Sequence, residues 1–168
     1  NEPERTFDIG RDLLAEAKSS KDELSIAKAY LLQSFSGFFL GIHGLSFEYV
    51  NRALPIFIKY RDKKNEAAAY NTLGYIYDYF DDHESRLEIN LKSLELRKEV
   101  GNATEYTASL INTGDSYLSL NKLEKALEYF NKSLENTPLQ NLRQRAITTS
   151  NIAETYYRLK EFKKANTS

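Results

Sequence analysis

The feature that most constrains this chain is an internal repeat with a period of 40 residues. A shift of 40 places Gly74 on Gly114 and Tyr77 on Tyr117, and a last shift of 39 places Ala153 in the same column as Gly114. Four copies stay in register along the chain. A fixed period of this length is typical of architectures in which each repeat stacks on its neighbours.

Each period contains two segments with apolar or small residues at helical spacing, for example Tyr70, Leu73, Gly74 and Tyr77. The sequence therefore predicts an all-α protein built from helix pairs. The predicted helices are 4–19, 22–42, 45–61, 65–80, 84–99, 104–120, 123–136 and 140–159, with a further helix starting near Glu161.

These helices predict one solenoid over residues 1–168. It comprises the second helix of a partial repeat in 1–20, full repeats in 21–62, 63–102 and 103–139, and a truncated repeat in 140–168. Because both ends fall within a repeat, we expect further protein to cover the last helix.

The glycine column predicts the closest contact within each pair. At Gly74 and Gly114 a larger side chain would push the two helices apart, and Ser34 and Ala153 are the small residues of the first and last copies. Helix starts are predicted at Asn102 and Asn121, because each is followed by a glutamate three residues later.

Composition excludes several classes of protein. The 23 basic and 24 acidic residues give a net charge of −1, which argues against a general nucleic-acid binder. No apolar run reaches about 20 residues, so we expect no membrane insertion. The absence of cysteine excludes disulfides and thiolate sites. We expect a soluble chain in the cytoplasm, and the sequence leaves the periplasm open.

Seven positions of the third repeat resemble the tetratricopeptide repeat, and 53–80 is similar to its longer variant of about 40 residues found in bacterial signalling proteins. The departures are Arg86, where the family prefers alanine, and Gln33, Ser34 and Gly37 in the first helix of the first full repeat. The resemblance implies a right-handed superhelix of antiparallel helix pairs and a role in binding proteins or peptides. The seven positions are Leu110, Gly114, Tyr117, Ala126, Phe130, Leu134 and Pro138.

We find no motif for catalysis, a cofactor or a metal in the sequence. His43 and His83 share one repeat column, and we interpret them as residues at helix starts rather than as metal ligands. Asp81 and Asp82 are interpreted in the same way, rather than as a general acid and base. The sequence therefore predicts a protein that is not an enzyme and has no cofactor.

The resemblance also implies that the first helices of the pairs line a concave groove. Its residues in the N-terminal half are aromatic or apolar, and those in the C-terminal half are polar with acids. The predicted groove residues are Leu32, Phe35, Phe38, Phe39, Tyr75, Tyr79, Asn112, Asp115, Asn151 and Glu154.

Two interpretations stay open for the apolar segment 29–42. Neighbouring helices cover it, or it forms an exposed pocket for a peptide, a protein partner or a second copy in a homodimer. Asn112 and Asn151 resemble groove asparagines that hold a peptide backbone, and ordinary solvated side chains are the alternative.

The function we favour is a non-enzymatic module that binds a protein or peptide, in the sensory or regulatory region of a larger bacterial signalling protein. A free-standing scaffold or adaptor is the alternative. A small-molecule site at the aromatic end of the groove is a third hypothesis, and it would require a closed pocket with convergent polar groups.

Overall fold

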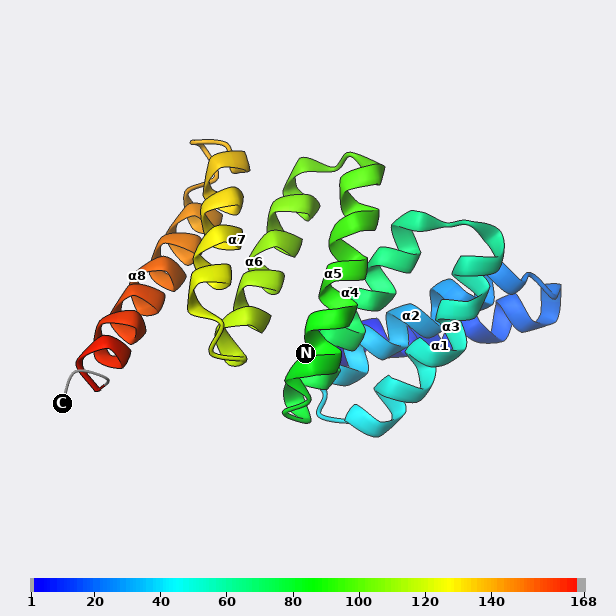
Figure 1. The fold of residues 1–168 in the computed structure, drawn as a ribbon. Helices are drawn as coiled ribbons and strands as arrows, with labels where there is room; N and C mark the ends of the chain where they lie inside the picture. Colours follow the sequence, from blue (N-terminus) through cyan, green and yellow to red (C-terminus); the bar gives the residue numbers. More distant parts are fainter. Residues whose placement is uncertain (1, 166–168) are drawn as a thin grey trace. The chain divides into compact units, whose positions relative to one another are not determined.

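The computed structural model describes residues 2–165, with side chains described through Glu161. These residues form helices joined by short turns, and no β-strand occurs among them (Figure 1). Asn1 and residues 166–168, the end of the predicted truncated repeat, lie outside the described part. The helices are α1 (Glu2–Ser20), α2 (Glu23–Phe39), α3 (His43–Tyr60), α4 (Lys63–Tyr79), α5 (His83–Val100), α6 (Ala103–Ser119), α7 (Leu123–Asn136) and α8 (Leu142–Ala165).

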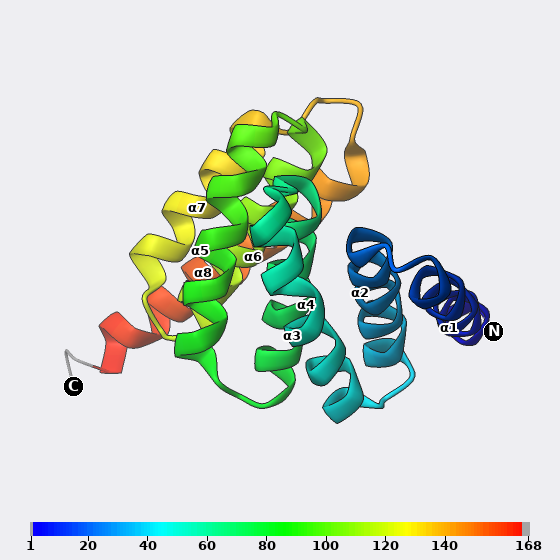
Figure 2. The same cartoon turned by 90° about the vertical axis from the view of Figure 1, so that its right-hand side faces the viewer.

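The helices confirm the all-α fold of paired helices. Partners such as α2 and α3, or α6 and α7, run antiparallel and pack directly on each other (Figures 1 and 2). The chain forms two compact units, one ending at Leu96 and the other beginning at Arg97. The first unit holds α1 to α4 and most of α5, and the second holds α6 to α8.

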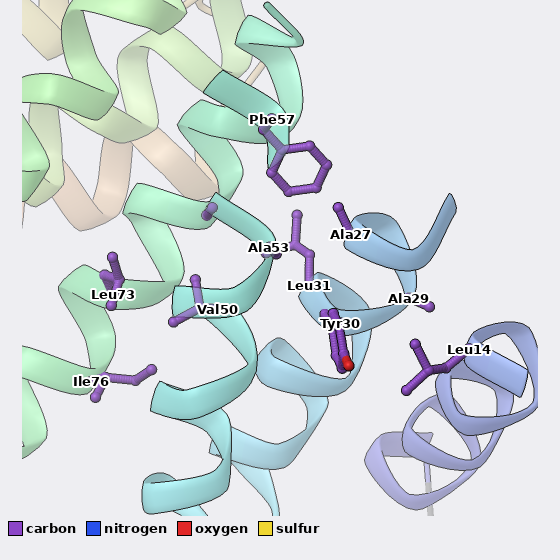
Figure 3. Packing of buried hydrophobic residues seen from close by; sticks show 11 residues of the cluster. Leu14, Ala27, Ala29, Tyr30, Leu31, Val50, Ala53, Phe57, Leu73 and Ile76 are labelled. Atoms are coloured by element: carbon purple, nitrogen blue, oxygen red, sulfur yellow. The ribbon is translucent and has the colours of Figure 1, made fainter. Parts of the chain in front are cut away.

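The core of the first unit lies on both sides of α3. Val50, Ala53 and Phe57 of this helix are fully buried. Figure 3 shows them between the apolar side chains of α2 and those of α4, which include Leu73 and Ile76. The segment 29–42 is therefore partly covered by its neighbours, as one of the two interpretations required.

The repeat extends to individual hydrogen bonds. The hydroxyl of Ser93 in α5 donates to the carbonyl of Ala67 in α4 at 3.0 Å, and that of Ser133 in α7 donates to the carbonyl of Thr107 in α6 at 3.1 Å. Both the donors and the acceptors are 40 residues apart. Each bond ties the second helix of a pair to the first and satisfies a buried hydroxyl.

The structure confirms that the small residues of the glycine column lie at the closest contacts within the helix pairs. A β-carbon on Gly114 would lie 2.5 Å from Cε1 of Phe130, and one on Gly74 would lie 2.5 Å from Oδ1 of Asn90. Ser34 is fully buried and donates its hydroxyl to a carbonyl of α3 at 2.7 Å. Each small residue thus makes room for a side chain of the second helix.

One of the two predicted helix caps is correct. Asn102 caps α6, since its side chain accepts a hydrogen bond from the backbone N–H of Glu105 at 3.1 Å. The prediction for Asn121 is wrong. Its φ of 54° places it in the left-handed region, and the residue before α7 is Lys122, which makes no side-chain cap. Asparagine tolerates that conformation, so here it makes the turn instead of capping the helix.

The predicted end of the last helix is also wrong. We expected a break near residue 160, but α8 continues beyond it. At the three turns between the first and second helices of a pair, Gly41, Asp81 and Asn121 adopt positive φ. The residue of α8 in the same repeat column is Lys160. Positive φ would be sterically costly for lysine, which favours continuation of the helix. Lys21 and Arg61 do adopt positive φ, but after each of them the next helix packs on the helix before it, and no described helix follows α8.

The described helices cover α8 on one face only. Thr148 and Thr155 are fully buried, whereas Ala153 is exposed. Tyr156 is 58% exposed, although its counterpart Tyr117 is only 7% exposed because α7 packs over it. No described helix therefore covers the face of α8 that carries Ala153 and Tyr156.

Candidate functional site

Three phenylalanines of α2 begin a continuous set of aromatic contacts in the first unit. Phe35 and Phe39 lie one helical turn apart with ring centroids 5.0 Å apart, and Phe38 meets Phe39 edge-on at 5.5 Å. Phe38 also stacks on Tyr75 of α4 at 5.9 Å, which joins neighbouring first helices. The structure thus brings together four predicted groove residues from two repeats.

The set continues through His43 and Phe80, two residues that the sequence did not assign to the groove. His43, the first residue of α3, lies 3.6 Å from Tyr79 and 5.1 Å from Phe38, measured between ring centroids. Tyr79 then meets Phe80 at 5.3 Å. We call this set the aromatic strip: Phe35, Phe38, Phe39, His43, Tyr75, Tyr79 and Phe80.

The aromatic strip is an exposed surface rather than a covered core. Phe35 is 42% exposed, and Phe39, Tyr79 and Phe80 are each more than half exposed. Phe38 and Tyr75 are half-buried beneath them. Exposed rings in contact with one another form the kind of apolar patch that usually marks an interaction site.

Acidic residues adjoin the aromatic strip. Asp78 forms an ion pair with Arg86 at 2.6 Å, and the Arg86 side chain is largely buried. Asp82 caps α5 by accepting the backbone N–H of Ser85 at 3.1 Å. Hydrogen bonds from the side chain and backbone of Ser85 hold the pKa of Asp82 below its usual value. The unusual arginine of this repeat is therefore neutralised within the unit.

Both histidines lie at helix starts, as the sequence predicted. His43 begins α3 and His83 begins α5, and the Nδ1 atoms of both rings are buried without a hydrogen-bond partner. Among the described residues, no group of three or more histidine, cysteine or acidic side chains could hold a metal ion.

Leu32 does not join the aromatic strip. It lines a separate cavity of about 640 Å³ in the first unit, together with Leu13 and Ala17 of α1 and Asn65 of α4. The predicted groove residues of α2 are therefore divided between two features.

The polar groove residues belong to the second unit. Asn112 and Asp115 of α6 line a cavity of about 350 Å³, whose other walls include Ile111 and Ile147. The Asn151 amide of α8 donates to the Asp115 carboxylate at 2.8 Å. The Asn151 side chain thus joins α8 to α6. The sequence predicted either a contact with a bound peptide backbone or a solvated side chain, and neither prediction included this contact between helices.

Glu154 does not join this cavity. It forms an ion pair with Arg158, one turn later on the same helix, at 2.7 Å. The spacing of four residues is a signal that the sequence carried.

No described helix of the structure is long and apolar enough to cross a membrane.

Comparison with known proteins agrees with the geometry. Residues 107–138, which include all of α7, match the family model of the tetratricopeptide repeat. The crystal structure of the apo form of RapI superimposes with a TM-score of 0.81 at 22% identity, over 96% of this chain and 45% of RapI. Residues 107–138 are a tetratricopeptide repeat, and the chain has the fold of tetratricopeptide-repeat proteins.

Similar helical repeats occur in two longer proteins. Response regulator aspartate phosphatase I of Bacillus subtilis is 30% identical over 126 residues, which are 73% of this chain and 32% of that protein. A signal transduction ATPase with a tetratricopeptide repeat sensor from Pyrococcus horikoshii superimposes with a TM-score of 0.80 at 24% identity, over 95% of this chain and 25% of the ATPase. This repeat module thus spans about a third of the curated relative.

Proposed function

We propose that this repeat module is the sensory or regulatory region of a larger bacterial signalling protein, and that it acts by binding a protein or peptide. The observation that carries the proposal is the aromatic strip, with four half-exposed rings on one surface of the first unit. Aromatic side chains supply a large contact area at a low cost in conformational entropy. The names of two relatives, a response regulator phosphatase and an ATPase with a repeat sensor, support a signalling context.

The proposed role is non-enzymatic. The two histidine Nδ1 atoms have no hydrogen-bond partner, so neither is joined through that atom to a base or a nucleophile. The phosphatase activity in the name of the curated relative belongs to that protein, of which this chain spans about a third. We propose a cytoplasmic location, where response regulators and their partners would meet.

The alternative is a free-standing adaptor that holds two proteins together. The second cavity, between α6 and α8, favours it because it offers a separate surface, lined by isoleucines as well as by Asn112 and Asp115. The small-molecule hypothesis gains less support, since the aromatic strip is an open surface. An adaptor must bind two partners at once, whereas a sensory region needs only one.

The test is capture of a partner with this chain, followed by calorimetry on single variants. Phe39→Ala and Tyr79→Ala should each weaken binding by at least about tenfold, because buried aromatic anchors contribute about 2 kcal/mol or more. Tyr60→Ala is the matched control, since Tyr60 is 48% exposed at the opposite end of the unit. Unchanged affinity in the first two variants, with a loss in the third, would move the site away from the aromatic strip.

A further inference from the structure

The end of the first unit that carries the aromatic strip is acidic. Segments 35–48 and 75–88 hold six acidic residues and one arginine. Segments of the same length at the opposite end of these helices, 16–29 and 56–69, hold seven basic and five acidic residues. The end with the aromatic strip therefore has an excess of acidic residues, and the opposite end has an excess of basic residues. Glu48 and Glu88 are paired with Arg52 and Lys92, which lie just beyond the two acidic segments.

Two of these acids carry unpaired carboxylates. Asp78 and Asp82 are engaged by Arg86 and by the start of α5. In contrast, none of the described hydrogen bonds or ion pairs involves the carboxylates of Asp81 and Glu84, which are both exposed. Asp81 directly follows Phe80 of the aromatic strip, and Glu84 lies in the first turn of α5.

We propose that the aromatic strip binds a basic peptide segment in which arginine or lysine alternates with apolar residues. This inference rests on the proposed function and names the chemistry of its partner. The apolar side chains pack on Phe35, Phe39 and Tyr79. A guanidinium stacks on an aromatic face and pairs with a neighbouring carboxylate, an arrangement for which arginine is suited. Asp81 and Glu84 supply the carboxylates.

The chain itself offers a clean assay, because it contains no tryptophan. Three pentapeptides with blocked ends place one tryptophan between two variable residues: Ac-Leu-Arg-Trp-Arg-Leu-NH₂, its Gln analogue and its Glu analogue. Tryptophan fluorescence and anisotropy then report the peptide alone. We expect the Arg peptide to bind tightest and the Glu peptide weakest, with the difference larger in low salt, where screening is weak.

Single variants separate the two contributions. Phe39→Ala should weaken all three peptides, whereas Tyr60→Ala at the basic end should not. Asp81→Asn should weaken the Arg peptide alone, by about two- to fivefold in low salt, as expected for an exposed charge pair. Asparagine also tolerates the positive φ of 56° at this position. Asp12→Asn on α1 is the matched charge control.

The outcomes distinguish the two proposals. Equal binding of the three peptides, lost in Phe39→Ala, would overturn the charge preference and leave the binding surface in place. A preference for the Glu peptide would also overturn it. If no peptide binds, or if Phe39→Ala has no effect on binding, the aromatic strip is not the site and both proposals fail.

Discussion

A single methyl group on Gly114 tests the close packing of α6 against α7. In Gly114→Ala the new β-carbon would lie 2.5, 2.6 and 3.0 Å from three ring carbons of Phe130. Carbon atoms in contact prefer about 3.5–4.0 Å. The ring is fully buried and cannot move into solvent, so the two helices must shift. Overpacking of this kind costs about 1–3 kcal/mol.

The matched control is Gly44→Ala in α3, where a β-carbon would meet no atom of another helix within 4 Å. Alanine in place of a helical glycine gains up to about 1 kcal/mol. We therefore expect Gly44→Ala to raise the free energy of unfolding slightly and Gly114→Ala to lower it by about 1–2 kcal/mol. The same change of residue then has opposite signs at two sites, because only one site is packed.

The assay is denaturant unfolding followed by far-UV circular dichroism, with the slope of the transition compared among variants. A double-mutant cycle with Phe130→Leu isolates the contact, since the Gly114→Ala penalty should shrink by about 1 kcal/mol once the ring is gone. Stabilisation by Gly114→Ala equal to that of Gly44→Ala, or additive effects in the cycle, would refute the close contact.

Three further results are expected. Gln33→Leu should stabilise the first unit by about 1–3 kcal/mol in denaturant unfolding, because Gln33 is 2% exposed and its Oε1 has no hydrogen-bond partner; a loss of stability would show that the amide is satisfied. Amides of α8 should exchange with deuterium faster than those of α6, because the Tyr156 face is open; equal protection would contradict this. The lowered pKa of Asp82 means that its stabilising contribution is present above the unfolded value near 3.8 and is lost as the pH falls through the folded value. Acid titration of Asp82→Asn should therefore show a weaker pH dependence than wild type, and an unchanged curve would exclude the cap as its source.

The sequence by itself determined the helices, their pairing and the close contacts at Gly74 and Gly114. These features follow from local rules: apolar residues at helical spacing specify a buried face, and a residue without a side chain is needed where two helices meet. The 40-residue period repeats these rules, so even the bonds of Ser93 and Ser133 recur at the same spacing. Five of the seven residues of the aromatic strip were predicted as groove residues, and that prediction came from the family resemblance rather than from these rules.

Only the tertiary structure decided which side chains meet across repeats. It placed His43 on Tyr79, 36 residues away, and gave Asp115 an amide partner in Asn151. It also exposed Tyr156, whose sequence position matches the buried Tyr117. A repeat pattern gives equivalent residues the same direction on their helices. What each residue contacts depends on the side chains and helices that neighbouring repeats place opposite it, and those differ from one repeat to the next.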